Sequence, residues 1–238
     1  MKISKMLSTA STTAAALTLF SACTPTSVVS NYLPAPFIPL HPPTTFNAPG
    51  TLVFFEKTNG KPHIGTICAV GGEHRKLMRE SITEEASIIS QKSLNGNVTI
   101  APNDLVAINK KLGTIANASL SGVQVKTVYQ EFKNAKLLQV SFQHLSEIEA
   151  ALKQSPSCQD GIERAMQDPK RKIATVYQVY QADVTYKVEF ETKLNAETEI
   201  TAMKIVNLEL NGSYDSSGNE IRGGKGLFFA AALDPNPS

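Results

Sequence analysis

The strongest pattern in the chain is an alternation of apolar and polar residues between positions 173 and 193. Apolar residues occupy one parity and mostly charged or polar residues the other: Val176, Tyr180, Ala182, Val184, Tyr186, Val188 and Phe190 against Gln181, Asp183, Thr185, Lys187, Glu189 and Glu191. A period of two is typical of a β-strand, because successive side chains point to opposite faces of the sheet. The pattern predicts one long strand with a buried face and a wet face, which an antiparallel sheet accommodates.

Three further stretches favour strands. Residues 122–142 are rich in strand-forming side chains around a break at Lys133 and Asn134. Residues 52–55 and 64–70 flank Asn59-Gly60, a typical hairpin turn. Residues 227–233 form a last apolar run after a turn at 215–219.

Helical spacing appears between these strands. The expected helices begin at Asn103, at a Ser146–Glu149 capping box and at Asn195, and another carries Cys158, Ile162 and Met166 on one face. Residues 73–100 show no sustained period. We therefore expect an α+β fold, a mostly antiparallel sheet with long amphipathic strands and flanking helices, in a single domain over residues 51–238.

The first 23 residues have the features of an export signal. Lys2 and Lys5 are followed by an apolar run that ends at Ser21-Ala22-Cys23. This ending resembles the lipobox of bacterial lipoproteins. The resemblance implies that residues 1–22 are a signal peptide, that Cys23 is acylated, with palmitate for example, and that the protein is anchored in the cell envelope. Thr24 stands where Asp would resemble an inner-membrane retention signal, so the outer membrane is favoured if the host has two membranes.

Residues 23–50 are expected to be a tether between this lipid and the domain. Seven of the 13 prolines lie here, at positions 25, 34, 36, 39, 42, 43 and 49. Such composition favours extended chain with no packed core, and its full reach would be roughly 80 Å.

The charge of the chain limits the kinds of binding partner, and its cysteine content indicates a disulfide. Removal of residues 1–22 takes away Lys2 and Lys5 but no acid, so the mature chain has equal numbers of basic and acidic residues. Nucleic acid is therefore not an expected partner. Once Cys23 carries lipid, Cys68 and Cys158 remain as one pair in an oxidising compartment, which favours a disulfide over two buried thiols.

The chain offers no short catalytic motif. Acidic pairs occur at Glu84/Glu85, Glu147/Glu149, Glu189/Glu191 and Glu197/Glu199, but neighbours in sequence do not show convergence across a cleft. His63, Cys68 and His74 do not have the spacing of a standard zinc site. We therefore expect no catalytic residues, no metal and no cofactor.

The sequence favours a membrane-tethered envelope lipoprotein that acts as a non-enzymatic binding or assembly module with an envelope protein partner. Three alternatives remain open. They are an envelope-polymer hydrolase without a short motif, a membrane-inserting β-hairpin protein built from segments 122–142 and 173–193, and a carrier of a small ligand.

Overall fold

The computed structural model describes residues 33–58, 61–100, 102–115, 120–214 and 220–234. The expected signal peptide, Cys23 and the turn expected at 215–219 lie outside these residues. Along the chain the elements are β1 (Ile38–Thr44), β2 (Leu52–Thr58), β3 (Lys61–Cys68), α1 (Gly72–Arg75), β4 (Arg79–Ser81), α2 (Glu84–Leu94), α3 (Pro102–Thr114), β5 (Val125–Gln139), α4 (Phe142–Gln154), α5 (Pro156–Met166), β6 (Lys172–Phe190), α6 (Ala196–Leu210), β7 (Ser213–Tyr214) and β8 (Glu220–Asp234).

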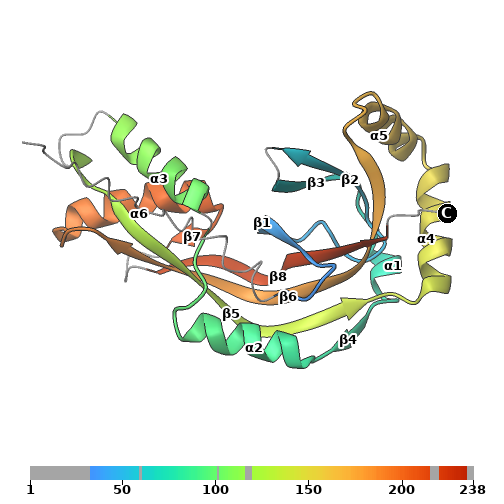
Figure 1. Cartoon of the computed structure of the whole chain (residues 1–238), viewed down its shortest axis with the longest axis horizontal. Helices are drawn as coiled ribbons and strands as arrows, with labels where there is room; N and C mark the ends of the chain where they lie inside the picture. The colour runs from blue at the N-terminus through green and yellow to red at the C-terminus, as the bar shows by residue number, and fades with distance from the viewer. Residues whose placement is uncertain (1–32, 59–60, 101, 116–119, 215–219, 235–238) are drawn as a thin grey trace, which may run out of the picture.

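The sheet is antiparallel throughout and is organised around β6, its 19-residue central strand. One edge of β6 pairs first with β2 and then with β5, and its other edge pairs with β8. β1 and β3 lie at the two ends of the strand order β1-β8-β6-β2-β3. Figure 1 shows β5, β6 and β8 running side by side along the length of the molecule. The expected α+β class is confirmed.

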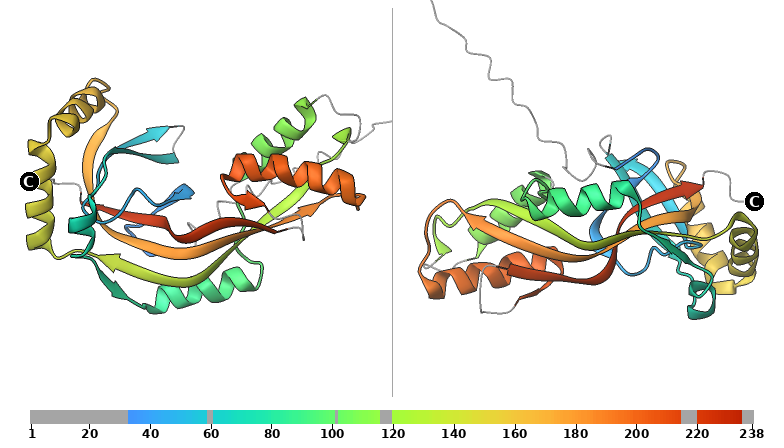
Figure 2. Two further views of the ribbon diagram at one scale, coloured as in Figure 1. Left: turned by 180° about the vertical axis from the view of Figure 1, so that it is seen from behind. Right: turned by 90° about the horizontal axis from the view of Figure 1, so that it is seen from below.

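The helices gather at the two ends of this long sheet. α3 and α6 lie together near one end of β5 and β6, whereas α4 and α5 follow each other at an angle at the other end, where the chain passes from β5 to β6 (Figures 1 and 2). α2 lies along β5. The two ends therefore have different neighbours and offer different surfaces.

The burial of side chains along β6 follows the predicted alternation. Tyr180, Ala182, Val184, Tyr186 and Val188 are each no more than 2% exposed, and the residues between them are half-buried. They belong to the main core, which also contains Ile108 and Leu112 of α3 and Met203 and Val206 of α6. Three further predictions are confirmed: the hairpin of β2 and β3, the last strand and the Asn195 cap. The Asn195 side chain accepts a hydrogen bond from the Thr198 backbone N–H at 2.9 Å.

The Pro-rich segment differs from the expectation. Residues 38–44 are β1, with Ile38 opposite Ala231 and Thr44 opposite Phe228 of β8, and Leu40 is buried. The expected tether over 23–50 is therefore wrong for this part. Prolines mislead here because β1 is an edge strand, and an edge strand has one side that needs no ladder hydrogen bonds.

The start of α4 also differs. Its N-cap is Ser141, whose hydroxyl accepts from the His144 backbone N–H, and Ser146 lies inside the helix and donates to the Phe142 carbonyl. Glu149 is buried in the helix and does not close a capping box. The expected box is wrong because the helix begins one turn earlier, after Ser141, which places Leu145 and Ile148 in the buried face of α4.

Four smaller differences concern single residues and the limits of elements. The break at Lys133 and Asn134 is a bulge within one continuous strand, and Asn134 takes the left-handed conformation with φ 56°. Asn103 lies inside α3, which begins at Pro102. Met166, expected on the buried face of α5, is exposed, whereas Cys158 of that face is buried. The unassigned stretch 73–100 contains α1, β4 and α2.

Candidate functional site

An apolar groove of about 600 Å³ lies at the α4 end of the sheet. Side chains from several distant segments line it: Pro36, Ile38, Phe55, Phe142, Lys172, Ile173, Ala174, Tyr177, Leu233 and Asp234. Its volume falls within the range of about 300–1,000 Å³ that is usual for binding pockets.

Strand register brings these segments together. Lys172, the first residue of β6, is opposite Phe55 of β2. Three residues later, Thr175 is opposite Asp234 of β8. The end of β8 and the beginning of β6 therefore meet beside β2, and the sheet itself forms the floor of the groove.

Phe142 forms one wall and is 73% exposed. Its ring stacks against that of Tyr177, with centroids 6.4 Å apart and 19° between the planes. The Ser141 cap fixes Phe142 as the first residue of α4, so the ring projects from the beginning of a rigid helix. Together with the apolar lining of the groove, this ring extends a continuous apolar surface, and such patches mark interaction sites.

The rim carries one charge of each sign. Lys172 is exposed and Asp234 is half-buried. Beside them Arg171 is held in place, with its Nε 3.0 Å from Glu56 Oε2 and its guanidinium 4.4 Å from the Phe54 ring centroid. An apolar floor with a mixed polar rim is the usual composition of a protein-binding patch.

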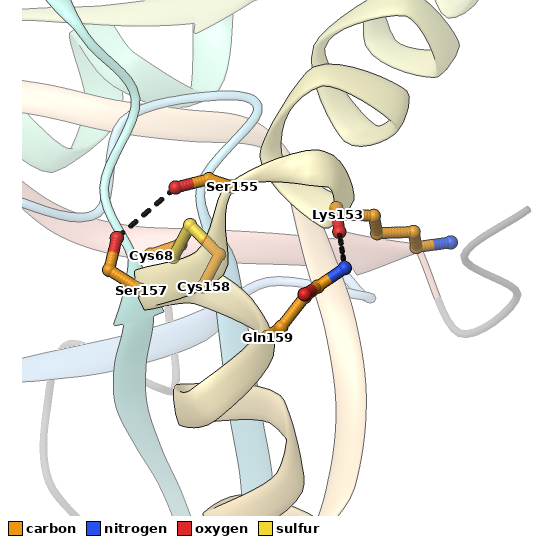
Figure 3. The surroundings of a disulfide bond; sticks show 6 residues. All are labelled: Cys68, Lys153, Ser155, Ser157, Cys158 and Gln159. Carbon is orange, nitrogen blue, oxygen red and sulfur yellow. Dashed lines mark hydrogen bonds between the residues drawn. A yellow bond between two sulfur atoms is a disulfide. The ribbon is translucent and has the colours of Figure 1, made fainter.

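The disulfide holds the helical wall of this end. Cys68, at the end of β3, is bonded to Cys158 of α5, and their Cα atoms are 5.6 Å apart (Figure 3). Nearby, the Ser155 and Ser157 hydroxyls are 3.1 Å apart, and Gln159 Nε2 donates to the Lys153 carbonyl at 3.0 Å. The expected pairing is present. It connects α5, and with it the adjoining α4, to β3, and through β3 and β2 to the groove.

The acidic pairs noted in the sequence stay apart in the fold. They lie on α2, α4, α6, and on or just after β6. The Cys68 sulfur is bonded to Cys158 and is not available to a metal together with His63 and His74. In the described part of the chain, no group of three or more His, Cys, Asp or Glu side chains is arranged to hold a metal ion. Cys23 lies outside the described residues.

Shifted pKa values occur away from the groove, within the long ladder. Burial raises the pKa of Glu131, but hydrogen bonds from Lys133 and Lys187 outweigh it and bring that pKa below its usual value. Hydrogen bonds from the Asn134 side chain and the Gly226 backbone lower the pKa of Asp183. Glu131 is held by Lys133 of its own strand and by Lys187 of β6. Asp183 is held by Asn134 of β5 and Gly226 of β8, so both carboxylates are structural parts of the sheet.

The aromatic residues of the groove could not be identified from the sequence. Phe55, Phe142 and Tyr177 lie on three elements and have no common local pattern. Only Tyr177 could have been noticed in the sequence. It shares the odd-numbered positions of the polar residues of β6 and therefore points away from the side chains of the main core.

No protein-family model matches this sequence, and no curated protein matches it. Among solved structures, the chain is similar to a bacterial gasdermin from Bradyrhizobium tropiciagri, with a TM-score of 0.36 and 14% sequence identity, covering 87% of this chain and 83% of that chain. No helix of the described residues is long and apolar enough to cross a bilayer.

Proposed function

We propose that this chain is a lipid-anchored protein of the bacterial cell envelope that acts as a binding module for an envelope protein partner. The observation that carries the proposal is the apolar groove with the exposed, stacked Phe142 at its wall. The Ser21-Ala22-Cys23 ending supports the anchor, and with Thr24 after Cys23 the outer membrane is favoured where the host has two membranes.

The position of β1 changes the geometry of the tether. Ten residue steps separate Cys23 from Leu33, the first described residue. Fully extended chain spans at most about 3.6 Å per residue, so the folded domain stays within about 36 Å of the lipid. Pro36 and Ile38 line the groove, so the tether enters the domain beside it. A partner bound in the groove would therefore sit close to the membrane surface.

The shape and rim of the groove favour a protein occupant. A concave surface receives side chains, whereas contact with a bilayer needs apolar side chains that project outward. Lys172 and Asp234 at the rim offer both a donor and an acceptor to a polypeptide. We expect aromatic or aliphatic side chains of the partner to fill the groove, since such anchors dominate protein interfaces.

The anchor is tested by Cys23→Ser with labelled fatty acid. We expect the label in the wild-type protein and not in the variant, and we expect the precursor of the variant to remain unprocessed. Equal labelling of both proteins would refute lipid attachment at Cys23.

The groove is tested by a photo-crosslinking amino acid placed at Phe142 in intact cells. Leu208, which is 72% exposed on α6 and lies outside the groove, is the matched control position. We expect a discrete protein adduct from position 142 alone, and its loss when Tyr177→Ser is added. Equal adducts from both positions, or none from position 142, would contradict the proposal.

Membrane insertion is a second candidate, supported by the ladder of β5 and β6. These strands have 15 and 19 residues, and about 10 are enough for a membrane-spanning strand. The apolar face of β6 is covered by the core helices, so insertion requires that these helices move away. Release of dye from liposomes by the mature protein, without an adduct at position 142, would favour this candidate over the binding module.

A further inference from the structure

A second, smaller cavity lies at the opposite end of the sheet, between α3, α6 and the β5–β6 ladder. It has a volume of about 170 Å³ and is distinct from the groove. Figure 1 shows α3 and α6 together at this end. Ile100, Ile108 and Leu210 give it apolar walls.

The floor of the cavity is polar. Gln130 and Tyr186 face each other across the ladder and are 1% and 2% exposed. Gln130 Oε1 has no hydrogen-bond partner among the described residues. A buried acceptor without a donor costs about 1–3 kcal/mol, so the cavity is a site where an incoming N–H would stabilise the protein.

The mouth of the cavity is acidic. Asp104 of α3 and Glu209 of α6 lie on either side of it. Lys111 Nζ is 4.0 Å from Glu209 Oε1 and partly offsets that charge, whereas no ion pair joins Asp104 to another described residue. Burial raises the pKa of Tyr186, a hydrogen bond with the Gln130 side chain lowers it, and the Asp104 carboxylate raises it. The phenol of Tyr186 is therefore already bonded to the Gln130 amide group, and among the described residues it is Gln130 Oε1 that is left without a partner.

We infer that this cavity binds a small aliphatic primary amine, whose ammonium group donates to Gln130 Oε1 and is attracted by Asp104 and Glu209. The short alkyl chain would contact Ile100, Ile108 and Leu210. A cation is favoured over a neutral donor because the mouth carries two carboxylates and one lysine. An anion is disfavoured for the same reason.

The test is an NMR titration of the mature, full-length protein with n-butylamine, with n-butanol as the uncharged probe. We expect saturable shifts of the Ala107 and Gln130 amide signals with butylamine at millimolar concentration, and much weaker effects with butanol. If an Nα-blocked lysine amide bound more tightly than n-butylamine, the site would be assigned to a lysine side chain rather than to a free amine. Both ligands would be recognised through the same ammonium group.

Four variants decide whether the named residues are responsible. Gln130→Leu should weaken butylamine binding about tenfold, the effect of one lost hydrogen bond, and Asp104→Asn should weaken it several-fold. Asp160→Asn, an exposed acid on α5, is the matched control and should bind like the wild type. Ala107→Phe blocks the mouth from an exposed helix position and leaves the core intact, so it covers the case in which Gln130→Leu does not fold.

Two results would overturn the inference. In one, butylamine shows no saturable binding to the wild-type protein, which means that the cavity holds water only. In the other, it binds equally well to Gln130→Leu, Asp104→Asn and Ala107→Phe. Neither result bears on the groove at Phe142, so the proposed function is tested separately.

Discussion

Cys68 and Cys158 are 90 residues apart in sequence and are joined by a disulfide between the end of β3 and the first turn of α5. Around this bond Leu52, Ile67, Leu152 and Ile162 form a small apolar cluster of their own, separate from the main core. The bond therefore joins α5 to β3 within a small apolar cluster.

Removal of both cysteines, by Cys68→Ser with Cys158→Ser, should lower the free energy of unfolding by about 4–5 kcal/mol. A closed loop of this length restricts the unfolded chain by that amount in the chain-entropy model. Denaturant unfolding of the oxidised wild type and the double variant measures the difference. Mass analysis should find no free thiol at either position in the oxidised protein, and two alkylated cysteines would contradict the bond.

Val188→Asp should unfold the domain or destabilise it by several kcal/mol. Val188 is 1% exposed, and an unpaired carboxylate in the core is costly in a marginally stable protein. Thr185→Lys is the matched control, because Thr185 lies on the half-buried face directly opposite Glu131. It should change stability by no more than about 0.5 kcal/mol. Equal destabilisation in thermal unfolding would mean that both faces of β6 are covered.

Ser141→Ala should cost about 1 kcal/mol of stability, because it removes the N-cap of α4. Ser146→Ala changes the same residue type inside the helix and should be neutral or stabilising by about 0.5 kcal/mol, since alanine is the better helix former. Chemical denaturation of the two variants compares them directly. If Ser146→Ala lowered the stability more than Ser141→Ala, Ser146 would be the N-cap of α4.

Glu131→Gln should reduce the dependence of stability on pH in the acid range. The pKa of Glu131 is lowered in the folded protein, so its contribution is complete above the ordinary glutamate pKa of about 4.3 and is lost as the pH falls through the lowered value. The variant should be less stable than the wild type at pH 7 by about 1–3 kcal/mol, because glutamine has no charge and keeps only one acceptor oxygen for Lys133 and Lys187. The free energies of unfolding of the variant and the wild type should converge as the pH is lowered from 7 to about 3. A difference that is constant with pH would contradict this account.

The sequence by itself determined the elements whose signal is local. The alternation from Tyr180 to Val188 fixed the buried face of β6, because a strand exposes every second side chain whatever its neighbours are. The Asn195 cap and the pairing of the two cysteines could also be predicted. A helix start needs a side-chain acceptor, and two cysteines left as a pair in the oxidising compartment that the sequence leads us to expect favour a disulfide.

The tertiary structure decided what depends on partners distant in sequence. β1 is a strand because β8 supplies its hydrogen bonds, although its own prolines favour extended, unpaired chain. The choice of Ser141 over Ser146 followed the packing of α4. The groove at Phe142 and the cavity at Gln130 are each lined by segments from across the chain, so no local pattern encodes them, and only strand register and helix packing bring their residues together.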